Sequence, residues 1–298
     1  MSRKAAAAAT LWLPGFDPEP PEPHVDDSAH PKPEIKGAPP TLLPAPANDL
    51  LLEERKPGRT HEWRFGLIPA QKQEKAALPA RLNSSSFIGL SGNAAKYDAN
   101  LAAIEALNRV EAEHRQADEQ ERRLLVRYCG WGCLPAAFNL DGKETAWADR
   151  AQRLQTLLAP NDYESARSSV NNSHYTPFFI VEAIWAAVQR LGFNGGRVLE
   201  PAAGTGHFIG AMPLSLAERS NVTAVEIDSL SGRMLRTLYA PSGVDVQITP
   251  FEATRFPSHW FDLVIGNVPF GKYKVADTSN RPFARFSIHN YFVRREVA

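Results

Sequence analysis

The 298-residue sequence has few of the features that mark secreted, metal-binding or membrane-spanning chains. It has only two cysteines, Cys129 and Cys133, and no histidine pair lies near them at ligand spacing. Two thiolates make half of a four-ligand zinc site, so we expect no metal and interpret both as reduced thiols in a tight turn. No apolar run approaches the roughly 18 residues that a membrane span needs, and no secretory signal is recognisable. These absences predict a cytoplasmic protein with no membrane partner.

The sequence also has no excess of charge of one sign, because Lys plus Arg and Asp plus Glu each number 33. A local bias appears from Arg255 onward, where seven basic residues stand against three acidic ones. Such a patch suits a phosphate backbone. Charge alone leaves nucleic-acid binding and ordinary solvated surface equally open.

Proline is concentrated at one end and divides the chain into three parts. Residues 1–80 hold 14 of the 24 prolines, which prevents helix propagation and predicts a disordered leader. Residues 94–170 predict a helical region. Its first amphipathic helix covers 94–127 with a break near 116–118, a Gly-Trp-Gly turn follows at 130–132, and two more helices cover 145–158 and 162–169.

The third part, residues 171–298, alternates between helical and strand patterns. Thr176 and Pro177 predict a helix start, as N-cap and first helical residue, and Gly192 predicts its end. Short apolar runs predict strands at 197–200, 222–227, 245–248 and 261–265. This alternation predicts an α/β fold with a parallel, doubly wound sheet.

The strongest chemical signal follows the first predicted strand. Glu200-Pro201-Ala202-Ala203-Gly204-Thr205-Gly206 ends that strand and opens a helix, and glycines there let the backbone approach a ligand. Glu226, at the end of the second strand, is placed to bind ribose hydroxyls. Both features also occur in dinucleotide enzymes.

Two further features favour S-adenosylmethionine over a dinucleotide. Glu200-Pro201 precedes the glycines, and no third glycine follows three residues later. Asn267-Val268-Pro269-Phe270 then follows the fourth strand. The Asn267 side-chain oxygen and the Val268 carbonyl can accept both hydrogens of an exocyclic adenine amine, which aims its lone pair at a methyl donor. Pro269 holds the turn, and Phe270 stacks on a base flipped out of the duplex.

These segments together resemble a known family. The motifs at 174–177, 200–206, 225–228 and 267–270 resemble motifs X, I, II and IV of adenine-N6 DNA methyltransferases, in the order of the class whose target-recognition domain comes last. The segments 127–135, 163–167 and 266–275 are similar to the N-terminal part of large methyltransferase–helicase fusion proteins of conjugative elements and phages, often described as antirestriction-like. The resemblance covers roughly 96–292.

The resemblance implies a Rossmann-like S-adenosylmethionine-dependent methyltransferase fold and assigns roles to residues. Tyr175 and Thr176 would border the methionine end of the cofactor. The expected floor beneath it consists of Glu200, Pro201, Ala202, Gly204 and Gly206. Glu226 would bind the ribose, Ile227 would pack on the adenine, and Glu252, at the third-strand position, would contact the adenine. Ile227 and Phe208 have a competing interpretation as core residues.

The sequence departs from the family pattern at two positions. Val268 stands where the commoner motif has proline, which preserves the carbonyl, and Cys133 stands where the fusion family has glycine. The resemblance also implies DNA as a partner. The sequence predicts four strands where the family has seven, which implies truncation within the methyltransferase domain, so we expect a C-terminal methyltransferase or helicase portion, supplied in trans, as a second partner. A protein-glutamine methyltransferase and a non-catalytic DNA-binding remnant stay open as alternatives.

Overall fold

The structure is a computed structural model that describes residues 81–132, 134–139, 145–171, 175–278 and 281–296. The predicted leader at 1–80, Cys133 and His174 lie outside these residues. The described residues belong to one compact unit. Within these ranges, no helix combines the length and apolar character needed to cross a membrane.

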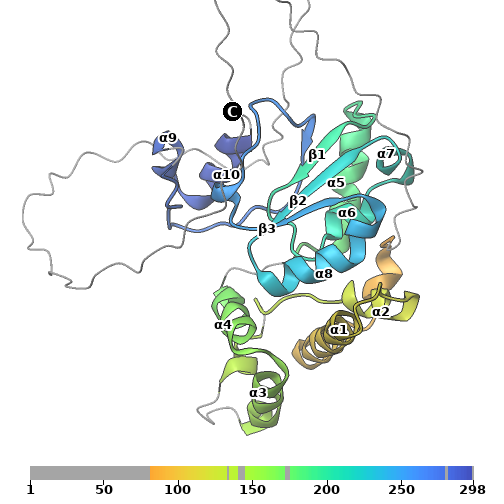
Figure 1. Cartoon of the computed structure of the whole chain (residues 1–298), viewed down its shortest axis with the longest axis vertical. Coiled ribbons are helices and arrows are strands. Elements are labelled where there is room, and N and C mark those ends of the chain that lie inside the picture. The colour runs from red at the N-terminus through yellow and green to blue at the C-terminus, as the bar shows by residue number, and fades with distance from the viewer. Residues whose placement is uncertain (1–80, 133, 140–144, 172–174, 279–280, 297–298) are drawn as a thin grey trace, which may run out of the picture. The chain divides into compact units, whose positions relative to one another are not determined.

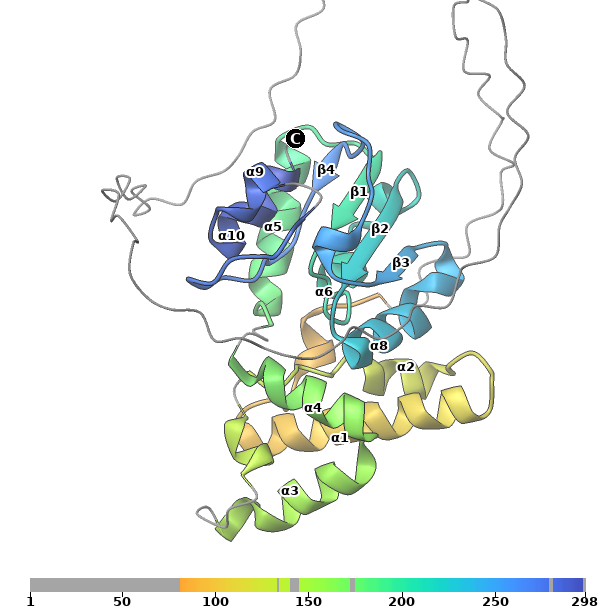
Figure 2. The same ribbon diagram turned by 60° about the vertical axis from the view of Figure 1, so that its left-hand side comes forward.

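Four parallel strands form one sheet in the order β3-β2-β1-β4 (Figures 1 and 2). Their bounds are β1 (Arg197–Glu200), β2 (Asn221–Glu226), β3 (Asp245–Ile248) and β4 (Leu263–Val264). The chain moves outward from β1 to β3 and then returns to the other side of β1 as β4. A reversal of strand order at β1 is the switch point at which open α/β sheets bind ligands. The predicted α/β class, with a partial parallel Rossmann-like sheet, is confirmed.

The predicted strand limits agree with the structure except at β2 and β4. Strand β2 is shifted by one residue, so that Ile227 lies just beyond it. Strand β4 has two residues instead of the five predicted. The Asp262 amide donates to the Arg197 carbonyl at 2.8 Å and the Ile265 amide to the Leu199 carbonyl at 3.0 Å, so backbone pairing with β1 extends past both ends. Among the described residues β4 pairs with β1 alone, which leaves it a short edge strand.

Helices cover both faces of the sheet, and alternate strand residues separate the two cores. Val198 and Ala224 join a cluster with α5 (Phe178–Arg190), α6 (His207–Ala211) and α8 (Ser229–Tyr239). Leu199 and Val225 point to the opposite face, where they cluster with residues of α10 (Ile288–Glu296). Two short helices complete this part of the chain, α7 (Leu214–Ala217) and α9 (Arg281–Ala284).

The helical region before α5 contains α1 (Asn93–Ala112), α2 (Glu119–Leu125), α3 (Thr145–Leu157) and α4 (Pro160–Ser168). Helices α1, α2 and α4 contact α8, and both ribbon views show them beyond α8 (Figures 1 and 2). Arg233 of α8 forms ion pairs with Glu111 of α1, at 2.8 Å, and with Asp162 of α4. One hydrophobic cluster includes residues of both the helical region and one face of the sheet, such as Leu107 and Val198, so the two share a core.

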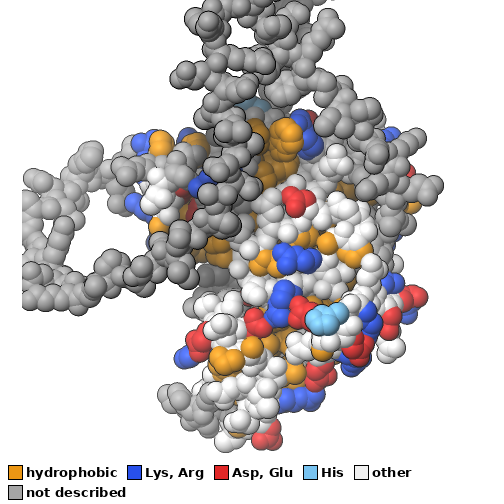
Figure 3. Space-filling model, in the orientation of Figure 1, with side chains coloured by type: hydrophobic (Ala, Val, Ile, Leu, Met, Phe, Trp, Pro, Cys, Tyr) orange, Lys and Arg blue, Asp and Glu red, His pale blue; other side chains and the backbone are white. Residues whose placement is uncertain are grey.

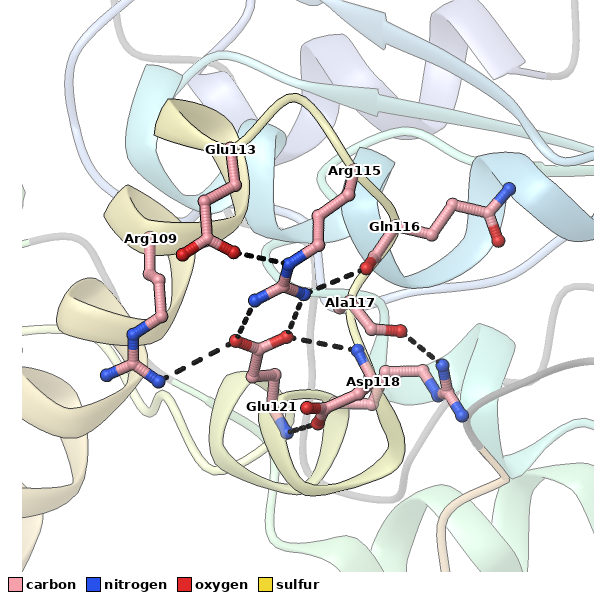
Figure 4. Close-up of polar contacts among 8 residues, drawn as sticks. Arg109, Glu113, Arg115, Gln116, Ala117, Asp118 and Glu121 are labelled. Carbon is pink, nitrogen blue, oxygen red and sulfur yellow. Dashed lines mark hydrogen bonds and ion pairs between the residues drawn. The ribbon is translucent and has the colours of Figure 1, made fainter.

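The predicted break near 116–118 is confirmed as the corner between α1 and α2 (Figure 4). Asp118 caps α2, since its side chain accepts from the Glu121 amide and the Glu121 side chain accepts from the Asp118 amide. The Arg115 guanidinium donates to the buried Glu121 carboxylate at 2.7 Å. Its hydrogen bond lowers the pKa of the Glu121 carboxyl to about 2. The corner is thus fixed by a capping box together with an ion pair.

The predicted N-cap of α5 is wrong by one residue. Pro177 occupies the N-cap position with an extended ψ of 134°, and the helix begins at Phe178. Proline fixes φ but leaves ψ free, so Pro177 ends the extended segment instead of starting the helix. The helix ends before Gly192, as predicted, where φ is 90°.

The visible surface matches the balanced composition. Basic and acidic side chains intermix over the area of α1 and α2 in the space-filling view (Figure 3). That area presents no field of one sign, so charge by itself does not single it out as a nucleic-acid interface.

Candidate active site

A cavity of about 540 Å³ lies at the carboxyl ends of the strands. Each strand contributes a residue at or just beyond its end: Glu200, Glu226, Thr249 and Asn267. Parallel strands bring their carboxyl ends to one edge of a sheet, so four segments far apart in sequence meet there. The cavity contains 13 of the 14 residues that the sequence nominated, namely Tyr175, Thr176, Glu200, Pro201, Ala202, Gly204, Glu226, Ile227, Glu252, Asn267, Val268, Pro269 and Phe270.

The glycine loop after β1 forms one wall of this cavity. The Ala203 amide donates to the Val225 carbonyl at 3.0 Å, which ties the loop to β2. Gly204 has a φ of 56°, and a Cβ there would lie 3.1 Å from the Tyr175 hydroxyl oxygen. The absence of a side chain therefore lets the loop approach the Tyr175 ring closely.

Gly206 is the one nominated residue that the structure does not bring to the cavity. It is the N-cap of α6 with a φ of 81°. A Cβ there would lie 2.6 Å from Leu235 Cδ1 and 2.7 Å from Tyr239 Cε2, both on α8. Gly206 therefore serves the close packing of the loop on α8.

We expect Gly206→Ala to lower the free energy of unfolding by about 2–4 kcal/mol, as overpacking adds to the cost of a left-handed backbone. Chemical denaturation measures this loss. Gly243→Ala is the matched control, since its φ is 87° but nothing lies within 4 Å of a Cβ there. Equal losses in the two variants would contradict the packing role.

Two buried carboxyl groups face the cavity. Glu226 is 8% exposed, and its two oxygens accept from the Gly204 amide at 2.6 Å and the Asp228 amide at 2.7 Å. Burial nevertheless raises the pKa of Glu226 to about 7. Glu200 is 2% exposed, and burial, followed by the nearby Glu226 charge, raises its pKa well above the usual value. Each group would be stabilised in its ionised form by a cationic or hydroxyl-bearing ligand.

Several buried polar atoms at this edge lack a hydrogen-bond partner within the described part of the chain. They are Glu200 Oε2, the Tyr175 hydroxyl and Thr205 Oγ1. Leaving such groups unpaired costs free energy, so a bound polar ligand is a natural partner for those that face the cavity. Burial raises the pKa of Tyr175, so its hydroxyl stays neutral and can donate.

His207 lines the cavity and also contacts the helical region. Burial lowers its pKa to about 4, so the ring is neutral, and Nε2 lies 3.3 Å from the Val126 carbonyl oxygen. Its ring packs edge-on against Tyr175, with 5.0 Å between centroids. Its role in the structure is to support Tyr175 from behind.

The segment 267–270 lines the same cavity as the glycine loop. A Cβ at Gly266 would lie 3.4 Å from Glu200 Cγ, so the end of β4 adjoins the end of β1. Phe270 is 58% exposed. All four residues of the segment line the cavity, which brings the predicted target-base motif and the predicted cofactor residues into one space.

The structure distinguishes the apolar candidates. Phe208 is buried in the core, where its carbonyl accepts from Trp185 Nε1 at 2.9 Å, and it also borders the cavity. Ile227 is 68% exposed at the cavity, so the core interpretation fails for it. Glu252 also lines the cavity, but from a 3-10 turn at Phe251–Ala253 beyond β3 and not from the strand itself.

Sequence reasoning missed several residues of the cavity. These residues lie in turns or near helix ends, and only tertiary packing brings them to the cavity. They are Tyr128, Ser165, Ser168, Ser169, Asp228, Ser231 and Tyr273–Ala276. For some of them the only sequence signal was their place in the family-like segments 127–135, 163–167, 225–228 and 266–275. In the described ranges no group of three His, Cys, Asp or Glu side chains is arranged to hold a metal ion.

The chain is similar to a curated phage protein. The chain is 30% identical over 220 residues to Defense against restriction protein B of Escherichia phage P1, a match that covers 73% of this chain. It spans only 8% of the length of that protein. No protein-family model matches the chain.

Two solved structures have a distant likeness. One, assigned as a class I S-adenosylmethionine-dependent methyltransferase of Listeria monocytogenes, is 12% identical, with 67% of this chain and 69% of that chain covered and a TM-score of 0.34. The other, a type I restriction-modification methyltransferase subunit of Streptococcus thermophilus, is 14% identical, with 63% and 48% covered and a TM-score of 0.32. Because both likenesses are weak, the fold assignment rests on the strand order and the two-sided packing described above.

Proposed function

We propose that this chain is the cofactor-binding part of an S-adenosylmethionine-dependent DNA methyltransferase that acts on adenine N6. One observation carries the proposal. A single cavity is lined by the glycine loop after β1, by the acidic residue ending β2 and by Asn267–Phe270 after β4. A dinucleotide enzyme explains the first two features but has no use for the third.

The residues present fit the cofactor. Its ammonium and sulfonium groups are cationic, and the cavity offers the unpartnered Glu200 oxygen and the Glu226 carboxylate. In the proposal Glu226 accepts from the ribose hydroxyls and exposed Ile227 packs on the adenine ring. Tyr175 and Thr176 border the methionine end. The floor consists of Pro201, Ala202 and Gly204, and Glu252 contacts the edge of the adenine.

The acceptor base is proposed to lie against Asn267–Phe270. The Asn267 side-chain oxygen and the Val268 carbonyl each accept one amino hydrogen, which frees the lone pair of the adenine nitrogen from ring conjugation. Pro269 keeps the two acceptors at fixed spacing, and Phe270 stacks on the flipped base. The cofactor, when bound, supplies an electrophilic methyl group. The chain contributes positioning and exclusion of water.

The wider setting is also a proposal. The phage relative is named for defence against restriction, and modification of DNA by an element-encoded methyltransferase would serve that purpose in the cytoplasm. We propose that the chain corresponds to the N-terminal part of a mobile-element methyltransferase–helicase protein. A C-terminal portion in trans would then complete the sheet.

The test is methyl transfer from labelled cofactor to long unmethylated duplex DNA, followed by nucleoside analysis. We expect label in N6-methyladenine and none on a duplex that contains only G·C pairs. Label on protein instead of DNA would favour the protein-glutamine alternative. Cofactor binding with no transfer to either acceptor would favour the non-catalytic alternative.

A further inference from the structure

The helical region supplies a side chain that reaches the motif at the end of β2. The Ser165 hydroxyl, on α4, donates to Asp228 Oδ1 at 2.7 Å. The two residues are 63 positions apart in sequence, and both line the cavity. Ser165 therefore connects the helices before the sheet with the acidic segment 226–228.

Asp228 is positioned by three hydrogen bonds. Its second oxygen, Oδ2, accepts from the Ser231 amide at 2.8 Å and from the Ser231 hydroxyl at 2.6 Å, which makes Asp228 the N-cap of α8. The Ser165 hydroxyl occupies Oδ1. A carboxylate anchored through both oxygens has little freedom to rotate, and the backbone that carries it is fixed as well.

The fixed Asp228 backbone in turn holds Glu226. The Asp228 amide donates to Glu226 Oε1 at 2.7 Å, and the Gly204 amide holds Oε2 at 2.6 Å. The Glu226 carboxylate is thus clamped between the glycine loop and Asp228. These two backbone amides, one bonded to each oxygen, orient the buried carboxyl group.

We infer that Ser165 is a positioning residue for the cofactor: it sets the orientation of Glu226 through Asp228, so that the helical region is a component of the cofactor site. The inference rests on the proposed function. It concerns a residue outside the sheet that does not itself need to touch the ligand. Arg233, which joins α8 to Glu111 and Asp162, holds α4 against α8 and keeps Ser165 within reach.

The test is S-adenosylmethionine affinity of the full chain, measured by calorimetry. We expect Ser165→Ala to weaken binding about 3- to 10-fold, because the Asp228 anchor loses a charge-assisted hydrogen bond. Ser165→Thr keeps the hydroxyl and should restore most of the affinity. Thr156→Ala is the control, since its hydroxyl bonds only its own helix, at the Gln152 carbonyl, and does not line the cavity.

A double-mutant cycle separates this relay from a general loss of stability. If Ser165 acts through Glu226, Ser165→Ala should change affinity less than about twofold once Glu226→Ala is present. An equal effect in both backgrounds, or unchanged affinity in Ser165→Ala alone, would overturn the inference while leaving the proposed function intact. No binding by the unaltered chain would overturn the proposed function and the inference together.

Discussion

Replacement of Asn267 by alanine is expected to abolish methyl transfer while leaving cofactor affinity within about twofold. The Asn267 side chain lies in the cavity at the end of β4, next to Val268 and Phe270. In the proposed function it orients the acceptor amine and makes no contact with the donor. Loss of one preorganised hydrogen-bonding group of this kind costs about 10²- to 10³-fold in turnover. Single-turnover methylation measures the rate, and calorimetry measures the affinity.

The matched control is Asn221→Ala. Asn221 is exposed and begins β2. It therefore lies at the amino ends of the strands, whereas the cavity lies at their carboxyl ends, so methyl transfer should be unaffected. A loss of cofactor affinity of about tenfold or more in Asn267→Ala, roughly 1.4 kcal/mol, would assign Asn267 to the cofactor and contradict its proposed role.

The opposite pattern is expected for Glu226. Glu226→Ala removes the acceptor proposed for the ribose hydroxyls and leaves the Gly204 and Asp228 amides without their present partner. The loss of the two amide contacts lowers stability in the free and the bound protein alike, whereas affinity falls because the buried ribose hydroxyls would lack their acceptor. An unpaired buried group costs about 1–3 kcal/mol, so S-adenosylmethionine should bind about 10- to 100-fold more weakly. Glu218→Ala, on the exposed end of α7, provides a carboxylate-to-alanine control. Equal affinities in the two variants would exclude Glu226 from the cofactor site.

The raised pKa of Glu226 also predicts how affinity depends on pH. At pH 6 the unliganded carboxyl, with a pKa of about 7, is mostly protonated, and binding must release that proton. Affinity should therefore fall by up to about tenfold between pH 8 and pH 6. The α-amino group of the ligand titrates in the same range, and Glu200, Asp228 and Tyr175 face the same space. The diagnostic quantity is the difference between the unaltered chain and Glu226→Ala, which should lack this component.

The same shift acts on stability without ligand. Because the folded-state pKa of Glu226 lies above its usual value, its contribution is fully present below about pH 4.5 and is lost as pH rises through about 7. Above about pH 7, where the free protein has lost this contribution, binding of the cofactor to ionised Glu226 would restore stability. Thermal unfolding with and without ligand at pH 6 and pH 8 measures this coupling.

The local sequence determined much of the framework. The alternation of helix and strand patterns predicted the parallel sheet, and the polar break near 116–118 predicted the corner between α1 and α2. Residues immediately after strands predicted most of the cavity, because parallel strands bring their carboxyl ends together whatever the details of packing. Most of the thirteen nominated residues in the cavity lie there for this reason, whereas Tyr175 and Thr176 precede α5 and follow no strand. The roles of all thirteen stay predictions.

Tertiary structure alone decided the rest. Gly206 and Gly204 look alike in sequence, yet Gly206 packs on Leu235 and Tyr239 while Gly204 faces Tyr175, because the loop turns between them. The link from Ser165 to Asp228 could not be predicted, since no local pattern specifies which residue a helix end meets 63 positions later. The apolar run at 261–265 likewise did not specify that β4 would be limited to Leu263–Val264.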